Sequence, residues 1–198
     1  MKVSIKSNID EATKWTTNLQ KKQIPFATSN AINKTLFQLR KEMMKQTVKK
    51  LDKPTPFTQK GFLVQMSKKT NLKGMLFIKD AVEEYLKYQI NGGVRSTGKQ
   101  IPIPYKDNAK LNKYGNIMGK RSGLIKKDTQ FFGTVKGVNG IWERQKQDNR
   151  LKLIYALTRT AAYEPKFPFY VIADKFVAAH FDKNFAEKFA HAVRTAKW

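Results

Sequence analysis

Residues 92–142 read GGVRSTGKQIPIPYKDNAKLNKYGNIMGKRSGLIKKDTQFFGTVKGVNGIW, and this stretch decides the fold. It combines glycines and lysines with short apolar motifs but follows no regular helical or strand period. A connection of this length without periodic structure is uncommon inside a compact domain. We therefore predict that residues 92–127 form a long basic loop that is ordered on assembly with a partner. Removal of residues 95–127 should then leave a folded protein.

Short extended segments lie within and beside this stretch. Residues 100–105, QIPIPY, alternate Ile with Pro and belong at a sheet edge, because proline cannot donate a hydrogen bond to a neighbouring strand. Residues 129–137 and 140–145 predict a hairpin that turns at Val138-Asn139-Gly140, since Asn-Gly favours tight hairpin turns. Residues 150–160, RLKLIYALTRT, are typical of a further strand. The middle of the chain therefore predicts a small, mainly antiparallel sheet.

Helices are expected on the N-terminal side. A short helix should carry Trp15 and Leu19, and Pro25 suits the first turn of a second helix that runs to about Lys50. Apolar side chains recur at helical spacing along the second helix. The predicted packing face comprises Ile32, Leu36, Leu39 and Met43, widened by Phe37, Met44, Val48 and Leu51.

Between this helix and the central stretch, the sequence predicts a hairpin and one more helix. Pro54 and Pro56 end the long helix, and residues 61–70 and 74–80 indicate two strands. Asp80 can cap a helix that ends at residues 91–93, Asn-Gly-Gly, which accept the left-handed conformation of a helix end.

The C-terminal part predicts two helices. The first follows Pro168 and carries Phe169 and Phe176, and Asp182 is expected to cap a second one carrying Phe185 and other apolar residues. The predicted fold class is α+β, with long N-terminal helices, a small sheet with a long central loop, and C-terminal helices. We expect a single domain over residues 1–198.

The chain carries a formal charge of +24, from 39 Lys and Arg against 15 Asp and Glu. The positive side chains repel one another, so this excess indicates a polyanion or an acidic protein surface as partner. Only seven of the 39 are Arg, the residue whose planar fork reads guanine edges, so sequence-specific DNA reading is disfavoured. No cysteine is present, which excludes disulfides, and no apolar run predicts a signal peptide or a membrane span. A soluble protein is expected.

Residues that could support catalysis do not form a recognisable constellation. The tract 115–122 differs from a phosphate-binding P-loop, because Tyr114 stands where the first glycine belongs and Arg121 where a Ser or Thr belongs. His180 and His191 match no common metal spacing. We therefore predict no enzyme activity, no catalytic residue, no cofactor and no metal site; a nuclease would need clustered carboxylates that the sequence does not offer.

Basic residues on the second helix and in the central stretch are candidates for facing DNA or an acidic partner, since backbone contacts need only charge and accessibility. Taken alone, the helical lysines are better explained as an ordinary solvated helix face. The charge excess of the whole chain shifts the balance towards an anionic partner. The candidates are Lys34, Lys41, Lys45, Lys49, Arg95, Lys99, Lys120, Arg121, Lys126 and Lys127. The candidate assembly loop is represented by Gly92, Gly93, Pro102, Pro104, Tyr105, Tyr114 and Gly115.

Taken together, several segments resemble the minor tail protein Z family of tailed bacteriophages, also described as tail-completion proteins. The resemblance runs through nearly the whole chain. Its segments are AINKTLFQLRKEM (31–43), NGGVRSTGKQIPIPY (91–105), LNKYGNIMG (111–119), FFGTVKGVNGIWER (131–144) and RLKLIYALTRTAAYEPKFPF (150–169).

The resemblance implies a structural virion protein that completes the head-proximal end of a phage tail and joins it to the head. It implies a homo-oligomer, with a hexameric ring as our hypothesis, around the DNA channel and in non-specific contact with packaged DNA. Its other partners would be tail terminator or tail tube proteins and head connector proteins, with no membrane. The implied location is the head–tail junction of the virion, after synthesis in the bacterial host cytoplasm. The alternative is a soluble, non-specific nucleic-acid-binding accessory protein.

Overall fold

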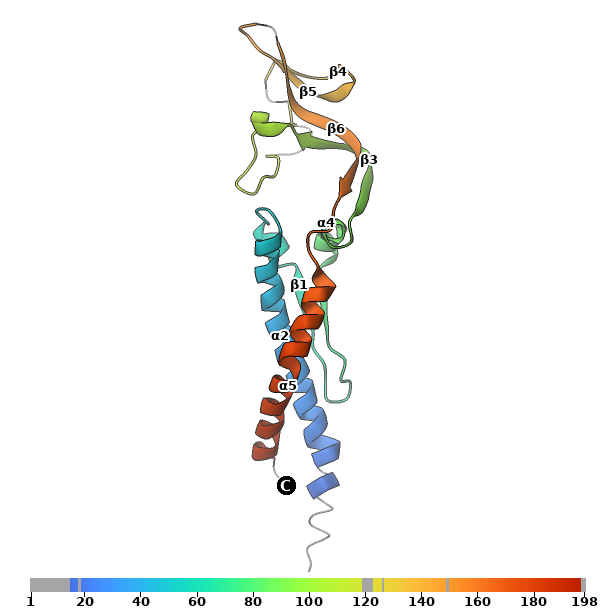
Figure 1. The fold of residues 1–198 in the computed structure, drawn as a ribbon, viewed down its shortest axis with the longest axis vertical. Coiled ribbons are helices and arrows are strands. Elements are labelled where there is room, and N and C mark those ends of the chain that lie inside the picture. Colours follow the sequence, from blue (N-terminus) through green and yellow to red (C-terminus); the bar gives the residue numbers. More distant parts are fainter. Residues whose placement is uncertain (1–14, 18, 119–122, 126, 149, 197–198) are drawn as a thin grey trace, which may run out of the picture. The chain divides into compact units, whose positions relative to one another are not determined.

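The computed structural model has both helices and antiparallel sheets, which confirms the predicted α+β class (Figure 1). Contacts within the chain cluster in two compact units. Unit 1 comprises residues 1–47, 59–82 and 168–198, and unit 2 comprises residues 48–58 and 83–167. The structure describes residues 15–17, 19–118, 123–125, 127–148 and 150–196.

Unit 1 is built on two long helices, α2 (Ile24–Lys50) and α5 (Phe169–Thr195). A short π-helix, η1 (Leu19–Gln23), leads directly into α2, and Pro25 lies in the first turn as predicted. The buried residues of α2 include every fourth position from 27 to 47, which aligns them along one side of the helix. They are Ala27, Ser29, Ala31, Thr35, Leu36, Leu39, Met43 and Thr47.

The widened apolar face predicted for α2 is only partly correct. Leu36, Leu39 and Met43 are buried, whereas Phe37 is 42% and Val48 is 53% exposed. Small residues, not large ones, occupy much of the buried side, because Ala and Thr let the backbone of a neighbouring helix approach closely. The large residues beside that side therefore stay at the surface.

The C-terminal part forms one helix, α5, so the prediction of two helices is wrong. Asp182 lies inside α5 and does not cap a new helix. Asp favours helix starts but does not break a helix, and residues 169–195 contain neither Gly nor Pro that would end one.

The predicted hairpin in unit 1 is confirmed. Strand β1 (Phe62–Gln65) pairs antiparallel with β2 (Met75–Ile78). Phe62 is fully buried, and its ring stacks on that of Phe169 in α5 with the centroids 6.2 Å apart. Ser67 ties the hairpin to α2, because its backbone N–H donates to the Asn33 side chain and its carbonyl oxygen accepts from that side chain and from Ser29.

Unit 2 begins with the end of α2 and the short helix α3 (Pro56–Gln59), whose last residue belongs to unit 1. Helix α4 (Asp80–Asn91) begins in unit 1 and continues into unit 2. The predicted end of α4 is confirmed. Gly92 has a φ of +71° and its N–H donates to the Tyr88 carbonyl.

The larger sheet of unit 2 contains β3 (Gly93–Pro104), β4 (Gln130–Val135), β5 (Val138–Arg144) and β6 (Leu151–Tyr163), in the order β3-β6-β5-β4. The central loop predicted over residues 92–127 is therefore partly wrong, since a third of it is strand β3. Strand β3 lies at an edge, as its prolines predict. Deleting residues 95–127 would remove most of this strand, so that deletion is not expected to leave unit 2 folded.

The rest of the predicted loop also packs, in part, on the sheet. A 3₁₀ turn, η2 (Lys106–Asn108), follows β3, and the Asn108 side chain donates to the Leu153 carbonyl. The buried core of the sheet includes two residues from the predicted loop. This core comprises Ala109, Leu124, Ile141, Ile154 and Tyr155, with Ile117 and Ile125 packed against it. Apolar residues between the lysines therefore pack this part of the segment against the sheet.

The hairpin of β4 and β5 is confirmed, but its turn is not at residues 138–140. Val135 pairs with Val138, so Lys136 and Gly137 make the turn, with φ values of +50° and +77°. Positive φ at both central residues is the requirement of a type I′ turn. Gly140 lies within β5, where an added Cβ would come 2.5 Å from the Tyr155 carbonyl oxygen. That glycine serves close strand packing and not the turn.

Candidate functional site

Three of the four candidate lysines on α2 are exposed. Lys41 and Lys45 belong to unit 1 and Lys49 to unit 2, and their spacing of four residues on one helix aligns them along one side. None of the ion pairs found among the described residues involves these three side chains. They are therefore available to an anionic partner.

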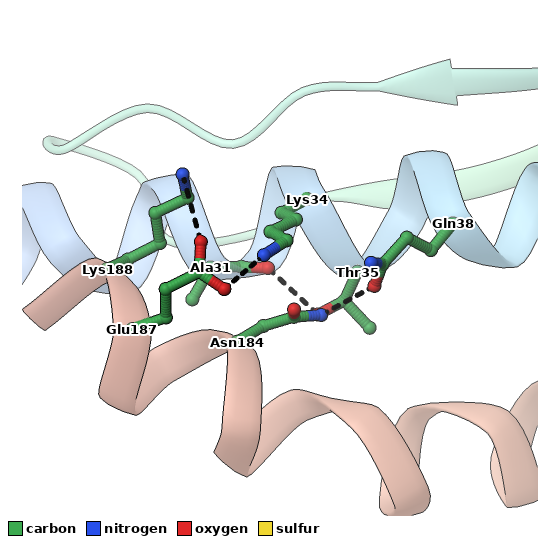
Figure 2. Close-up of polar contacts among 7 residues, drawn as sticks. All are labelled: Ala31, Lys34, Thr35, Gln38, Asn184, Glu187 and Lys188. Carbon is green, nitrogen blue, oxygen red and sulfur yellow. Dashed lines mark hydrogen bonds and ion pairs between the residues drawn. The ribbon is translucent and has the colours of Figure 1, made fainter.

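Lys34 differs from the other three, because it forms an ion pair with α5. Its Nζ lies 2.5 Å from Glu187 Oε2, and its side chain is 29% exposed (Figure 2). The hydrogen bond from Lys34 lowers the pKa of the Glu187 carboxyl below its ordinary value. Lys188 approaches the other oxygen of Glu187 at 3.9 Å. Lys34 thus contributes to the contact between α2 and α5.

A buried polar cluster lies beside this ion pair in unit 1 (Figure 2). Asn184 of α5 is 4% exposed, and its Nδ2 donates to Thr35 Oγ1 at 2.9 Å and to Gln38 Oε1 at 2.7 Å. Thr35 Oγ1 in turn donates to the Ala31 carbonyl of its own helix. A buried amide that is satisfied by the partner helix fixes how the two helices align along each other.

In unit 2, Lys127 forms an ion pair with a nearly buried carboxylate. Its Nζ lies 2.6 Å from Glu143 Oε1, and the Glu143 side chain is 14% exposed. The hydrogen bond from Lys127 lowers the pKa of Glu143 from its ordinary value of 4.5. This ion pair links the segment before β4 to β5 at the base of the hairpin. Lys127 is therefore engaged in a contact within the chain. The candidates Lys120, Arg121 and Lys126 lie outside the described residues.

The candidate residues of β3 and its flanks have separate surroundings. Arg95 is half-buried and lies opposite Ala161 of β6, whereas Lys99 lies where the register shifts between Ser96 and Ile101. Pro102 and Pro104 pair with β6 at the edge of the sheet, and Gly92 and Gly93 form the passage from α4 into β3.

The turn after η2 is ordered by its own hydrogen bonds. The Asn112 side chain accepts from the backbone N–H groups of Tyr114 and Asn116, and Gly115 has a φ of +75°. Tyr114 is half-buried, whereas Tyr105 is 42% exposed. Tyr114 is therefore positioned by a hydrogen-bonded turn.

Unit 2 contains a cavity of about 590 Å³ that two of the candidates, Arg95 and Tyr114, help to line. Its wall combines cationic, hydroxyl and aromatic side chains from five parts of unit 2. The lining residues are Leu51, Asp52, Lys53, Pro54, Thr55, Thr58, Tyr85, Leu86, Gln89, Arg95, Tyr114, Asn116 and Lys166.

Most of these lining residues are not among the candidates predicted from the sequence. Lys53 stands next to the prolines that end α2, and Lys166 stands between Pro165 and Pro168. Each Lys-Pro or Pro-Lys pair marks a cation on a restricted backbone, which is the only signal that the sequence offers. Nothing in the sequence indicates that the two segments meet at one cavity.

Large apolar side chains are unusually frequent at the surface. Among the described residues, 20 large apolar side chains are exposed, and 13 larger than alanine are buried. The exposed ones lie in both units. In unit 1, Met75 and Phe77 are 55% and 42% exposed and share one face of β2, because alternate residues of a strand point the same way. In unit 2, Phe132 of the edge strand β4 is 58% exposed.

Among the described residues, no group of three or more His, Asp or Glu side chains is placed to hold a metal ion. No helix in the described part of the chain has the length and apolarity needed to cross a bilayer.

Comparison with known proteins returned no relative: no family model, no curated protein and no solved structure matches this chain.

Proposed function

We propose that this chain is a structural subunit of a bacteriophage tail, which completes the head-proximal end of the tail and joins it to the head. The observation that carries the proposal is the surplus of exposed over buried large apolar side chains in the described residues, 20 against 13. Single apolar residues at a surface are ordinary, but a surplus on this scale favours burial against other subunits.

The exposed residues lie on elements that suit subunit contacts. The open face of β2 presents Met75 and Phe77, and β4 is an edge strand that carries Phe132. Strand edges and aromatic or Met side chains are frequent in protein interfaces. A homo-oligomer, with a hexameric ring as the working stoichiometry, would use such surfaces between neighbouring copies.

The charge supports a location beside packaged DNA. A chain of +24 in which Lys far outnumbers Arg binds phosphate backbones without reading sequence, as a conduit for DNA requires. Lys41, Lys45 and Lys49 are exposed and take part in none of the ion pairs among the described residues. The resemblance of residues 31–43 and of the segments between 91 and 169 to tail-completion proteins points to the same role. This role needs no catalytic site.

The direct test is to tag the C-terminus, purify particles of the phage that encodes the chain, and locate the tag by electron microscopy. We expect label at the head–tail junction. Native mass spectrometry of the isolated protein or junction complex should give six copies. Absence of the tag from particles would refute the virion role, and another copy number would refute the hexamer alone.

A second candidate function is that of a soluble, non-specific nucleic-acid-binding accessory protein. The exposed lysines of α2 favour it, because a helix with regularly spaced cations can follow a phosphate backbone. This function predicts absence from particles together with strong DNA binding. Binding should fall on the order of a thousandfold or more between about 50 and 200 mM salt if 6 to 10 phosphates are contacted.

A further inference from the structure

The cavity of unit 2 brings together three cations from separate parts of the chain. Lys53 follows the end of α2, Arg95 belongs to β3, and Lys166 belongs to the segment after β6. The ion pairs found in the described part of the chain include none of the three. Asp52 also lines the cavity and likewise pairs with none of them. The cavity thus holds a net positive charge, with three cations against one carboxylate.

The backbone is restricted at each of these three cationic residues. Lys53 has a φ of +44° and is followed by Pro54, which restricts the chain on both sides. The N–H groups of Lys166 and Phe167 both donate to the Gln89 carbonyl at 2.8 Å. Arg95 is fixed by antiparallel pairing with β6. Such restriction lowers the conformational entropy that a ligand must remove on binding.

Neutral hydrogen-bonding groups and aromatic rings complete the cavity wall. Thr58 Oγ1 lies 2.9 Å from the Tyr85 hydroxyl and 3.0 Å from Thr55 Oγ1, which forms a chain of three hydroxyl groups. Tyr85 and Tyr114 both contribute to the lining. Hydroxyls can donate to an anionic oxygen, and tyrosine rings can stack on a nucleobase.

We propose that this cavity binds a nucleotide unit, with its phosphate held by Lys53, Arg95 and Lys166 and its base against the tyrosines. A phosphate presents several charged oxygens, so it can accept from cations that approach from three sides, whereas a single carboxylate presents two oxygens. A volume of about 590 Å³ leaves room for a base and sugar beside the phosphate and lies in the range of small-ligand sites. The nucleotide can be free or part of a DNA strand.

The test measures binding to the full-length protein by calorimetry at constant ionic strength. The probes are inorganic phosphate, a deoxynucleoside monophosphate and a short single-stranded oligonucleotide. Arg95→Gln and Lys166→Gln should each weaken binding of the monophosphate at least tenfold, and inorganic phosphate should bind more weakly than the monophosphate. Circular dichroism checks that both variants fold. If Arg95→Gln does not fold, Lys166→Gln still tests the proposal, because Lys166 is exposed.

Lys69→Gln is the matched control, because Lys69 lines a different, lysine-lined cavity of unit 1 and the substitution removes the same charge. Its effect should stay below twofold. An equal loss in this control, or no binding of the monophosphate by the wild-type protein, would overturn the proposal.

Competition identifies the source of the nucleotide. Displacement of the monophosphate by the oligonucleotide at comparable concentration supports a nucleotide within DNA, and monophosphate binding without such displacement supports a free nucleotide. Nucleotide binding is measured on the isolated protein and does not depend on where the chain lies in a particle. Either the nucleotide site or the tail role can therefore be refuted without refuting the other.

Discussion

At the residue scale, polar side chains contribute to the contact between α2 and α5. Asn184 is buried and satisfied by Thr35 and Gln38, and the Lys34–Glu187 ion pair lies next to it (Figure 2). The ion pair is partly exposed, so solvent screens it and its contribution is small. The buried amide matters more, because its loss removes one hydrogen-bond donor from each of two partners on α2.

We expect Asn184→Ala to destabilise the protein by about 1–3 kcal/mol, because Gln38 and Thr35 each lose a buried donor. Urea unfolding followed by circular dichroism measures the change. Asp182→Ala is the control on the same helix; Asp182 is exposed, and its replacement should change stability by less than about 0.5 kcal/mol. Equal effects of the two substitutions would contradict the role of Asn184, and a costly Asp182→Ala would restore a capping role for Asp182.

The ion pair of Glu143 with Lys127 predicts a loss of stability in acid. Because the pKa of Glu143 is lowered below 4.5 in the folded protein, the unfolded chain binds more protons in acid. The stabilisation is present above pH 4.5 and is lost as the pH falls through the folded-state pKa. The lowered pKa of Glu187 acts in the same direction.

The urea concentration at the unfolding midpoint should therefore decrease as the pH is lowered below about 4.5. Glu143→Gln should make this decrease smaller. Glu164→Gln, which removes an exposed carboxylate of the same unit, is the control and should leave the pH profile near that of the wild type. Identical profiles for Glu143→Gln and the wild type would show that the ion pair does not contribute.

At the element scale, the β4–β5 hairpin shows how a strong local motif can mislead. Asn139-Gly140 is a favoured type I′ pair, yet both residues lie inside β5, and the turn uses Lys136-Gly137. Pairing of Ile141 and Trp142 with β6 fixes the register of β5. The residues left between β4 and β5 must then form the turn. Lys136 therefore adopts a positive φ that a lysine does not prefer.

Lys136→Asn should raise the thermal unfolding midpoint, since Asn tolerates the left-handed region, and Lys136→Val should lower stability by about 1 kcal/mol. Asn139→Val is the control, because this exposed strand position accepts a β-branched residue without cost. The opposite ranking, with Asn139→Val the costly change, would place the turn at residues 138–140.

At the scale of the whole molecule, the charge excess is shared by both units. Unit 1 holds 19 basic and 7 acidic residues, and unit 2 holds 20 and 8. Along the sequence, by contrast, residues 128–198 are less strongly basic than the rest, with 12 basic and 7 acidic residues. The fold joins α5, from this less basic region, with the more basic N-terminal region in unit 1. An anionic partner can therefore contact either unit.

We expect the double variant Met75→Gln with Phe77→Gln to remain folded but to assemble poorly, because it removes two exposed apolar side chains from one face of β2. Native mass spectrometry over a concentration series should show association weakened at least tenfold, which corresponds to about 1.4 kcal/mol. Thr70→Gln, in the connection between β1 and β2, is the control. Unchanged association of the double variant would exclude this face from the interface.

The sequence by itself determined the features that depend on neighbours along the chain. Helical spacing and proline placed α2, Asp80 and Gly92 bounded α4, and the prolines at 102 and 104 assigned β3 to a sheet edge. These are local constraints on the backbone, so a single sequence carries them. Composition likewise determined that the chain is strongly cationic and without cysteine.

Only the tertiary structure decided which distant residues meet. Lys34 meets Glu187 across 153 positions, and β3 pairs with β6 although the rest of the predicted loop and the β4–β5 hairpin lie between them. The cavity collects Lys53, Arg95 and Lys166 in the same way. Such contacts depend on bringing distant parts of the chain together and on complementary packing surfaces. Neither produces a periodic pattern in the sequence around each residue.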